Sequence, residues 1–600
     1  MITAYIDGYA IWLPANFSIE IVRQGNIPVK NEISGDYAPE ITIPGVPRNK
    51  VLLNHPDRFT IRNNTIREYS GFKLYVNGSC KISGTLVINE YSGGSFNGYV
   101  RGNVGELSEK QKQKSIRDFD YSKATRSFSK KSNYDPNTDS YCTPEIINND
   151  FFNNFGYNAE ITVDDETVET TSFNKWFYNN AGYVVNKSDA SGVISSEIQF
   201  QANTEENVAI NVVSPYLFIF NLLENLLKDD AYFIKQNDIL DNPELKKIIL
   251  YNNFDITKTS IVQQTDRVNS GSRRGSSVNT AWIEILNRKI AAFNYSDLLP
   301  SMSLNSFLVS IQNLLNYIVD IDPLNQVSFI DREAIFDQEA DDLDEYLVGE
   351  LIPGKKKDVT LKFSIKKDDT DSATGDIEEF DIKDRIDDFI EPEPTINGLR
   401  TRTVITGEPG QLMIVEDTGQ IFEYKLTIYD DKEQDLGVHY VVGGWVYVGT
   451  ILTSGYYNIK SGNDVETIES DFGAIMADGE YPFVSQPGSG NDRLVTYKEF
   501  NGRVLFYNGG ASCSQSSDNY TLSYIGPKGM INTRWQRTAE WWCHRLPVSC
   551  VMELPEHVLK GFNINRKKRT REGEFIIEKM VTKYTHAGVG QTQIDGYKAE

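Results

Sequence analysis

The stretch Phe72-Lys73-Leu74-Tyr75-Val76-Asn77-Gly78-Ser79-Cys80-Lys81-Ile82 decides how the first hundred residues fold. Its apolar side chains alternate with other residues, which is the period of a half-buried β-strand. Asn77-Gly78 favours a type I′ turn, because both residues tolerate the positive φ that this hairpin turn needs. The same alternation from Phe17 to Ile21, and a second reversal at Gly93-Gly94, predict a small antiparallel sheet or barrel.

Two segments before residue 142 are not expected to form central strands. The first carries prolines, which cannot donate a backbone hydrogen bond and therefore favour an extended strap or edge segment over a central strand: Pro39, Pro44, Pro47 and Pro56. The second, about Glu106 to Tyr141, is polar, rich in Lys and Arg, and without a period. It predicts a long loop or an arm, and an arm that reaches onto a neighbouring subunit is its functional interpretation.

The middle of the chain mixes helical and strand patterns. Ser214-Pro215 favours the start of a helix that continues to about Lys228, and a shorter helix is expected from Asp241 through Ile249. A second long helix is predicted by apolar residues at helical spacing: Leu304, Phe307, Leu308, Ile311, Leu314, Leu315 and Ile318. Strands follow at Tyr317 to Ile321 and Gln326 to Ile330. We interpret both apolar stripes as core packing.

Between Asp331 and Pro394 the composition becomes strongly acidic. The tract holds 22 Asp and Glu against 9 Lys and Arg, so it contributes 22 − 9 = 13 negative charges to the net -24 of the chain. Short strands such as Val359 to Ile365 are expected there, with much of the rest as loop. From about Arg400 to Ile459 alternation returns, with Trp445 and Tyr447 among its members, and predicts a small inserted β-meander.

The last hundred residues return to a defined pattern of short elements. In order, we expect a strand at Arg503 to Tyr507, a Trp-rich helix from about Ile531 to Arg545, a strand at Val548 to Leu554, a helical turn at Glu556 to Leu559, and a hairpin turning near Gly588 to Gly590. The fold class is therefore α+β and β-rich, with two β-rich ends that can pair into one composite structure around an α/β middle. The segments are an N-terminal β segment (1–105), a polar loop or arm (106–141), an α/β middle region (142–330), an acidic insertion (331–394), an inserted β-meander (395–500) and a C-terminal helix plus β segment (501–600).

Length, charge and composition exclude several classes of protein. Six hundred residues exceed one ordinary globular core. With 60 Lys and Arg against 84 Asp and Glu, the chain lacks the basic excess of a general nucleic-acid binder. The apolar stretch Tyr216 to Leu227 is short and interrupted by polar residues, so we expect a buried helix and no membrane insertion. Five Cys do not make a disulfide framework, and the N-terminus lacks a secretory pattern, which favours a soluble protein made in a reducing cytoplasm.

Catalytic and metal-binding motifs are weak throughout. Gly349 to Lys355 has the spacing of a phosphate-binding loop, but Lys356 follows where Ser or Thr is needed, and a strand pattern replaces the required helix. The thiols and imidazoles at Cys543-His544, Cys550 and His557 lack zinc spacing. A loose cation site at Asp369-x-Asp371 stays open as an alternative. No nucleophile elbow accompanies the five His. We therefore expect no enzyme, no catalytic or metal site and no cofactor.

One basic run stands out in this acidic chain. Arg566-Lys567-Lys568-Arg569-Thr570-Arg571 places five basic residues in six positions. They are our candidate interface or channel residues: Arg566, Lys567, Lys568, Arg569 and Arg571. Such a run can touch DNA phosphates, pair with an acidic neighbour, or form a solvated hairpin start. Pairing with another subunit is the functional interpretation that we favour.

Three stretches resemble the tail-hub, baseplate-hub or tail-tip proteins of tailed bacteriophages, especially those of Bacteroidetes phages and prophages. The first runs from Tyr37-Ala38-Pro39-Glu40-Ile41 through a Pro44-x-x-Pro47-x-Asn49 strap to Phe59. The second joins Ser214-Pro215-Tyr216-Leu217, Leu250-Tyr251-Asn252-Asn253 and the helix from Leu304. The third comprises Ser517-Asp518-Asn519-Tyr520, Gly529-Met530-Ile531-Asn532-Thr533-Arg534-Trp535 and Ile564-Asn565-Arg566.

The resemblance implies a structural scaffold. Proteins of this family place β-barrels related to the tail-tube fold around a channel, combine their N- and C-terminal parts, and commonly form a threefold ring. The implied partners are further copies of the chain in a homotrimer or higher ring, the tail tube or adjacent tail proteins, a spike, fibre or receptor-binding protein, and phage DNA in passage. The implied location is the virion tail, after synthesis in the host cytoplasm.

Two other functions remain as alternatives. One is a receptor- or glycan-binding tail protein that uses the meander around Trp445 and Tyr447 as its contact module. The other is a glycan-cleaving tail enzyme that uses carboxylates of the acidic tract. Deletion of Asp331 to Pro394 that leaves assembly intact but abolishes polysaccharide cleavage would favour the enzyme.

Overall fold

A computed structural model gives the fold of the chain. It describes side chains in residues 1–29, 31–55, 67–102, 114–121, 135–142, 215–229, 232–240, 242–252, 293–322, 324–364, 464–474, 522, 524 and 530–599, and some further strands by their backbone alone. The strand Arg503 to Tyr507, the Asp369-x-Asp371 pattern and Pro56 lie outside the described residues. The β-rich α+β class is confirmed, because large antiparallel sheets dominate the described chain.

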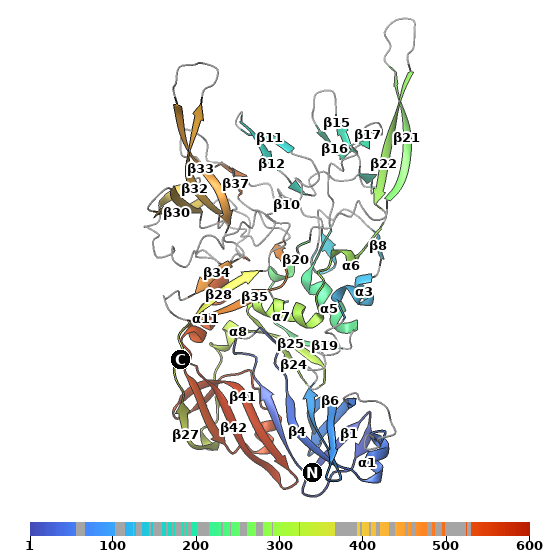
Figure 1. The fold of residues 1–600 in the computed structure, drawn as a ribbon, viewed down its shortest axis with the longest axis vertical. Coiled ribbons are helices and arrows are strands. Elements are labelled where there is room, and N and C mark those ends of the chain that lie inside the picture. The colour runs from blue at the N-terminus through green and yellow to red at the C-terminus, as the bar shows by residue number, and fades with distance from the viewer. Residues whose placement is uncertain are drawn as a thin grey trace.

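One 13-stranded sheet is built from both ends of the chain (Figure 1). In spatial order its strands are β2 (Tyr9–Ile11), β1 (Ile2–Ile6), β5 (Arg67–Val76), β6 (Ser79–Ser92), β7 (Ser95–Gly102), β4 (Tyr37–Pro44), β3 (Ser18–Gln24), β41 (Gly573–Thr585), β42 (Gly588–Lys598), β39 (Pro547–Met552) and β27 (Leu347–Pro353), with β40 (Lys568–Thr570) joining β41 to β26 (Asp341–Asp342). The ends meet where β3 runs antiparallel to β41, from Ser18 opposite Thr585 to Gln24 opposite Lys579. The predicted pairing of the two β-rich ends is confirmed.

The sheet is strongly curled. Three strands separate β6 from β41 in the strand order, yet the Lys81 ammonium of β6 lies 6.0 Å from the ring centre of Tyr584 in β41. The backbone N–H of Ile2 donates to Nδ1 of His586, at 3.4 Å, across the same concave space. Apolar side chains from strands of both ends, including Leu74 and Ile594, accordingly form one buried cluster. Burial on this inner face is what holds the two ends together.

The two predicted hairpin turns form at the predicted residues, whereas the predicted proline strap does not form in full. Asn77 and Gly78 have φ values of 48° and 80° in the turn between β5 and β6, and Gly93 and Gly94 have 59° and 79° between β6 and β7. Both predicted hairpins are therefore confirmed. The proline strap is wrong in part, because β4 lies inside the strand order, between β7 and β3. The strand tolerates Pro39 because the register shifts between Ala38 and Ile41, where a bulge needs no donor from the proline.

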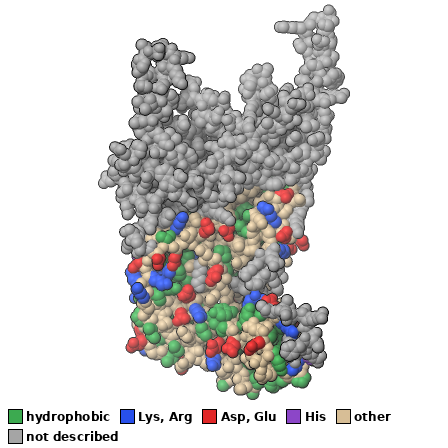
Figure 2. Space-filling view, viewed as in Figure 1, with side chains coloured by type: hydrophobic (Ala, Val, Ile, Leu, Met, Phe, Trp, Pro, Cys, Tyr) green, Lys and Arg blue, Asp and Glu red, His purple; other side chains and the backbone are tan. Residues whose placement is uncertain are grey.

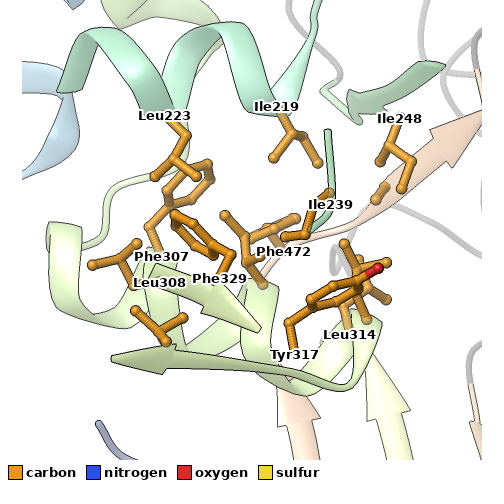
Figure 3. Close-up of a cluster of buried hydrophobic side chains, with 14 of the residues drawn as sticks. Ile219, Leu223, Ile239, Ile248, Phe307, Leu308, Leu314, Tyr317, Phe329 and Phe472 are labelled. Carbon is orange, nitrogen blue, oxygen red and sulfur yellow. The ribbon is translucent and has the colours of Figure 1, made fainter. Parts of the chain in front are cut away.

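Above this sheet in Figure 1 lies the α/β middle region. Its helices α5 (Ile219–Asp229) and α7 (Leu304–Leu315) pack with a three-stranded sheet of β19 (Phe233–Asn237), β25 (Gln326–Asp331) and β24 (Tyr317–Ile321). In Figure 3, Leu223 of α5 lies close to Phe307 of α7 and to Phe329 of β25 in a single apolar cluster. The cluster extends to Ile576 of β41, so it also packs against the sheet.

The long helix and the hairpin after it form as predicted. Ser303 Oγ accepts from the backbone N–H of Ser306 at 3.1 Å and caps α7 at its start. Asn316, with φ 58°, ends the helix in the left-handed conformation. Strands β24 and β25 then pair antiparallel, from Tyr317 opposite Asp331 to Ile321 opposite Val327. Ile318, which was included in the apolar stripe of the predicted helix, lies in β24.

Three predicted helices are shorter or broken. Tyr216–Leu217 is strand β18, paired with β9 (Tyr141–Cys142), so α5 starts only at Ile219. The helix expected from Asp241 is a 3-10 turn, η2 (Leu245–Lys247), followed by β20 (Ile248–Leu250), which pairs with β36 (Ala474–Met476). The Trp-rich helix is divided into α10 (Met530–Thr533) and α11 (Gln536–Cys543). At the break, the fully buried Trp535 ring packs 4.9 Å from Phe363.

Two segments treated as separate in the sequence belong to the main body. The described parts of the polar arm pack on their own chain, since Ile116 and Phe119 are fully buried and the Ile116 N–H donates to Met302 O at 2.8 Å. Residues 341–353, assigned to the acidic insertion, supply β26 and β27 to the 13-stranded sheet. Apolar burial and backbone pairing outweigh the polar composition of both segments.

The remaining acidic and meander segments are partly described. Strand β28 (Val359–Ile365) forms as predicted, between β34 (Ser454–Tyr457) and β35 (Asp464–Ser470). The meander is a separate five-stranded antiparallel sheet of β29 (Glu393–Ile396), β30 (Leu399–Thr406), β31 (Gly410–Val415), β32 (Gln420–Asp430) and β33 (His439–Thr450). Among the described residues, every helix is too short or too polar to cross a bilayer.

Candidate functional site

The basic run lies at the junction of three strands near one edge of the large sheet. Its strand β40 pairs antiparallel with the start of β41 and parallel with β26, where Asp341 lies opposite Lys568 and Asp342 opposite Arg569. Successive side chains of a strand point to opposite faces. Lys568 is therefore fully buried, while Arg569 is exposed. Acidic residues of the same chain therefore lie directly opposite basic residues of the run.

Lys568 is the buried member of this arrangement. Its ammonium lies 2.7 Å from Oδ2 of Asp341, also donates to the carbonyl of Asn563, and stands 4.5 Å from the ring centre of Phe562. Burial lowers the pKa of Lys568, and the Asp341 carboxylate opposes that shift. A buried ammonium is tolerated only where such partners replace water.

The other four basic residues have oxygen partners on the same chain. Arg566 lies 3.1 Å from the second oxygen of Asp341, and Arg569 lies 3.3 Å from Asp342. Lys567 lies 3.2 Å from Glu574 and donates to the carbonyl of Phe336. The Arg571 guanidinium donates to the carbonyl of Gly349 at 3.3 Å, and its backbone N–H to Asp344 Oδ1 at 2.8 Å.

The basic run thus fastens residues 341–353 to the C-terminal strands. Backbone bonds continue the same attachment, since the N–H of Leu343 donates to Arg569 O at 2.8 Å and that of Leu351 to the Glu572 carboxylate at 2.7 Å. We call this set of contacts the β26–β40 latch. A role for the five basic residues in an interface or a channel stays a prediction.

A second polar cluster joins the large sheet to the middle region. Arg23 of β3 lies 3.4 Å from Asp36, and Asp320 of β24 lies near both. Burial raises the pKa of Asp36 and of Asp320, with Arg23 opposing the shift in each. Asn26 links the N-terminal segment to the C-terminal segment, because its backbone N–H donates to Asn565 Oδ1 at 2.8 Å.

Arg332 lies next to this cluster and is 1% exposed. Its guanidinium donates to Asn316 Oδ1 at 2.8 Å, and burial lowers its pKa to about 9 although Glu333 and Asp331 oppose the shift. Glu333 in turn accepts from the backbone N–H of Thr538 at 2.8 Å, at the start of α11. These bonds fix the middle region relative to the C-terminal segment, which is a positioning role.

The thiols and imidazoles that the sequence singled out do not converge. Cys543 and Cys550 are buried, and burial raises the pKa of Cys550 to about 12, which makes its thiol inert. His544 pairs with Asp358 at 2.8 Å, and that hydrogen bond is the chief cause of the lowered pKa of Asp358. Within the described ranges, no three His, Cys, Asp or Glu residues are grouped as a metal site requires. Gly349 to Pro353 lies in β27, and the strand β28 follows, so the phosphate-loop geometry is not formed.

Sequence reasoning missed the two flanks of the large sheet. At one flank, large apolar side chains are exposed around α1 (Pro47–Leu52): Tyr9 at 69%, Trp12 at 45%, Val51 at 64% and Tyr91 at 38%. At the other flank, Val348 and Ile352 of β27 are exposed at 41% and 65%. Hydrophobic side chains also reach the surface of the lower part in Figure 2, among charges of both signs. Exposure of this kind depends on strand order, which alternation alone does not reveal.

Comparisons with known proteins give limited likenesses. No protein-family model matches the chain, and no curated protein matches it. Among solved structures, it is similar to the 43 kDa tail protein of prophage MuSo2 from Shewanella oneidensis, with 7% identity, a TM-score of 0.33, and coverage of 100% of this chain and 98% of that chain. It is also similar to the tail protein from Neisseria meningitidis MC58, with 7% identity, a TM-score of 0.29, and coverage of 100% and 96%. TM-scores this low do not establish a shared fold.

Proposed function

We propose that the chain is a structural protein of a bacteriophage tail. In this proposal it forms a hub ring that connects the tail tube to a spike or receptor-binding apparatus and lines the channel for genome ejection. The observation that carries the proposal is the pairing of β3 with β41, which joins the two ends of the chain in one curled sheet. The sequence resemblance to tail-hub proteins implies such a combination of the two ends.

The internal pairing of charges supports a scaffold over a nucleic-acid binder. The five basic residues of the latch bind carboxylates and carbonyls of their own chain, and Lys568 is fully buried. Binding to DNA phosphates needs Lys and Arg side chains that displace the counterions condensed on the DNA, and a run already paired with its own carboxylates is poorly suited to this. A channel wall that repels DNA would suit a chain of net charge -24, since like charges do not adhere. A channel lined by Lys and Arg would contradict this part of the proposal.

The partners follow from the proposed position in the virion tail. Further copies of the chain would complete the ring, the tail tube or adjacent tail proteins would bind above it, and a spike, fibre or receptor-binding protein below it. Phage DNA would pass transiently. Synthesis would take place in the host cytoplasm, and no cofactor and no membrane insertion are part of the proposal.

The test is to find the chain in an assembled particle and to measure its copy number. We expect electron microscopy of the virion, with the chain tagged, to show a ring of about three copies between tube and spike. Mass photometry of the purified chain gives the matching stoichiometry in solution. A tag located on the head or at a fibre tip would contradict the hub position.

A receptor- or glycan-binding function is the second candidate, and the meander is the observation that favours it. Its sheet is separate from the 13-stranded sheet, and its register places Phe422 opposite Tyr447 and Tyr424 opposite Trp445. Glycan binding would require the faces of these rings to be exposed, and Tyr and Trp suit such a surface because each has an apolar ring and a polar group. Saturable binding of host polysaccharide that Trp445→Ala abolishes, with Val446→Ala as control, would support this candidate.

A further inference from the structure

Two Asn-Gly pairs of the large sheet lie in very different surroundings. Asn77-Gly78 forms the turn between β5 and β6, where both residues are exposed. Asn97-Gly98 lies within β7, where Gly98 is buried and in register with Ile41 of β4 and Ile88 of β6. A glycine has no side chain to crowd its own nitrogen, so that nitrogen can react with the side-chain amide of a preceding asparagine. The remaining Asn-Gly pairs, at 397–398, 501–502 and 508–509, lie outside the described residues.

The reaction in question is deamidation, and its only co-reactant is water. The backbone nitrogen of Gly78 loses its proton and attacks Cγ of Asn77. The bond from Cγ to Nδ2 breaks, and Nδ2 leaves as ammonia together with that proton. Water then opens the resulting cyclic succinimide at one of its carbonyl groups. Opening on one side gives aspartate, and opening on the other gives isoaspartate, in which the main chain runs through the former side chain.

The β5–β6 turn leaves room for this attack, whereas β7 does not. A Cβ built on Gly78 would have no atom within 4 Å, so the glycine nitrogen can approach the Asn77 amide without a clash. A Cβ built on Gly98 would meet the carbonyl oxygen of Val87 at 1.9 Å. Reaction at Asn97 would therefore require β7 to leave its place between two strands, which is a local unfolding step.

The Asn77 side chain also links the two ends of the chain. Its Nδ2 donates to the carboxylate of Glu556, the first residue of α12 (Glu556–Lys560), and its Oδ1 accepts from the Met1 nitrogen. Helix α12 is held to the inner apolar cluster of the sheet by Leu559. Both bonds of the Asn77 amide are exposed, so water competes with them, and they slow the attack without preventing it.

Deamidation would break the link to α12. An oxygen replaces Nδ2 in the product, so a carboxylate at position 77 would face the Glu556 carboxylate, and like charges at hydrogen-bond distance repel each other. Isoaspartate also lengthens the main chain of a two-residue turn whose register pairs Val76 with Ser79. Either product therefore loosens the contact between the β5–β6 turn and α12.

We infer that Asn77 is a site of spontaneous deamidation, and that the reaction releases α12 from the β5–β6 turn. The chain thereby changes with age at a contact between its N-terminal and C-terminal parts. The inference does not depend on the proposed tail function, because it concerns a reaction of the isolated chain with water.

The first test compares the rates of deamidation at the two sites. Peptide mapping by mass spectrometry follows both in the full chain during incubation at mildly alkaline pH. A local opening that costs only about 1.4 kcal/mol slows a reaction about tenfold, so Asn77 is expected to react at least about tenfold faster than Asn97. In urea, where the chain is unfolded, the two sites should react at similar rates. Folded chain in which Asn77 reacts no faster than Asn97 overturns the inference.

The second test measures the release of α12 by hydrogen exchange. Peptides covering α12 should exchange about fivefold faster in the aged chain, and in Asn77→Asp, which imitates one product, than in the fresh unaltered chain. Glu556→Gln is the matched variant, because a glutamine amide can donate to the new carboxylate. Asn77→Asp combined with Glu556→Gln should therefore exchange as slowly as the unaltered chain. Unchanged exchange at α12 after full conversion of Asn77, or fast exchange that Glu556→Gln does not correct in Asn77→Asp, overturns the proposed release.

Discussion

Replacing Lys568 by Met tests how much the β26–β40 latch contributes to the sheet. The substitution keeps the apolar stem of the side chain beside the Phe562 ring and removes only the ammonium. It leaves the Asn563 carbonyl without this donor and Asp341 with Arg566, at 3.1 Å, as its nearby cation. The fully buried position makes the loss of the charge pair more costly than at an exposed site.

The expected magnitude follows from the burial of each partner. Breaking a fully buried pair costs about 3–5 kcal/mol, and since Asp341 is 34% exposed and keeps Arg566, we expect about 2 kcal/mol for Lys568→Met. Asp341→Asn should cost more, about 3 kcal/mol, because it leaves the buried ammonium without an anionic partner. Arg569→Met is the matched control, since both members of its pair are about half exposed, and it should cost less than about 1 kcal/mol.

Native-state hydrogen exchange measures this effect where it occurs. A loss of about 2 kcal/mol corresponds to roughly 30-fold faster exchange in peptides that cover residues 341–353. Peptides from β3 should change less, because β3 is bonded to β41 and not to the latch. Equal rates in Lys568→Met and Arg569→Met, or a smaller effect of Asp341→Asn than of Lys568→Met, would refute the reasoning from burial.

Two further predictions concern Asp320 of β24 and Gly78 in the turn between β5 and β6. Burial raises the pKa of Asp320, so its folded-state pKa lies above its unfolded value and the stability tied to its protonated form is lost as pH rises through the folded pKa. Asp320→Asn should therefore raise the melting temperature at pH 7. The gain in melting temperature should shrink as pH falls towards about 4, the ordinary carboxyl range. A gain that grows on acidification would contradict this prediction. Gly78→Ala should lower the free energy of unfolding by about 1–2 kcal/mol in a urea titration, because Gly78 has φ 80°, which a side chain disfavours. Gly561→Ala is the control and should be neutral, because Gly561 has φ −104°. Both glycines have open space around them, so the two variants differ in backbone conformation and not in steric contact.

Local signals in the sequence were sufficient where neighbouring residues decide the structure. Asn77-Gly78 fixes its turn by backbone preference alone, and Ser303 with the apolar stripe after it fixes α7. The pairing of the two β-rich ends was also accessible, because both ends carry strand patterns that need partners. The turn and the helix required no knowledge of a distant residue, whereas the pairing of β3 with β41 joins residues from opposite ends of the chain.

Sequence patterns did not predict contacts between side chains that lie far apart along the chain. Residues 341–353 read as part of an acidic loop, yet Asp341 pairs with Lys568, 227 positions away. The composition of the tract concealed a strand whose charges are neutralised by another segment. The basic run was likewise visible from its charges, but its partners were not. The break between α10 and α11 depends on the burial of Trp535 against Phe363, which helical spacing does not encode.

The latch also explains how copies of so acidic a chain can approach one another. Two molecules of net charge -24 repel, but in physiological salt a charge is screened beyond about 8 Å, so the local balance at the contacting surfaces decides. Beside β27, Asp341, Asp342 and Asp344 are bonded to residues of the basic run. At the other flank, Arg48 and Lys50 of α1 bring positive charge. The carboxylates that the latch pairs with cations of the same chain therefore add little to that repulsion. On this argument, reversing the latch charge with Arg569→Glu should weaken self-association more at low salt than at high salt, while leaving Lys568 buried and paired.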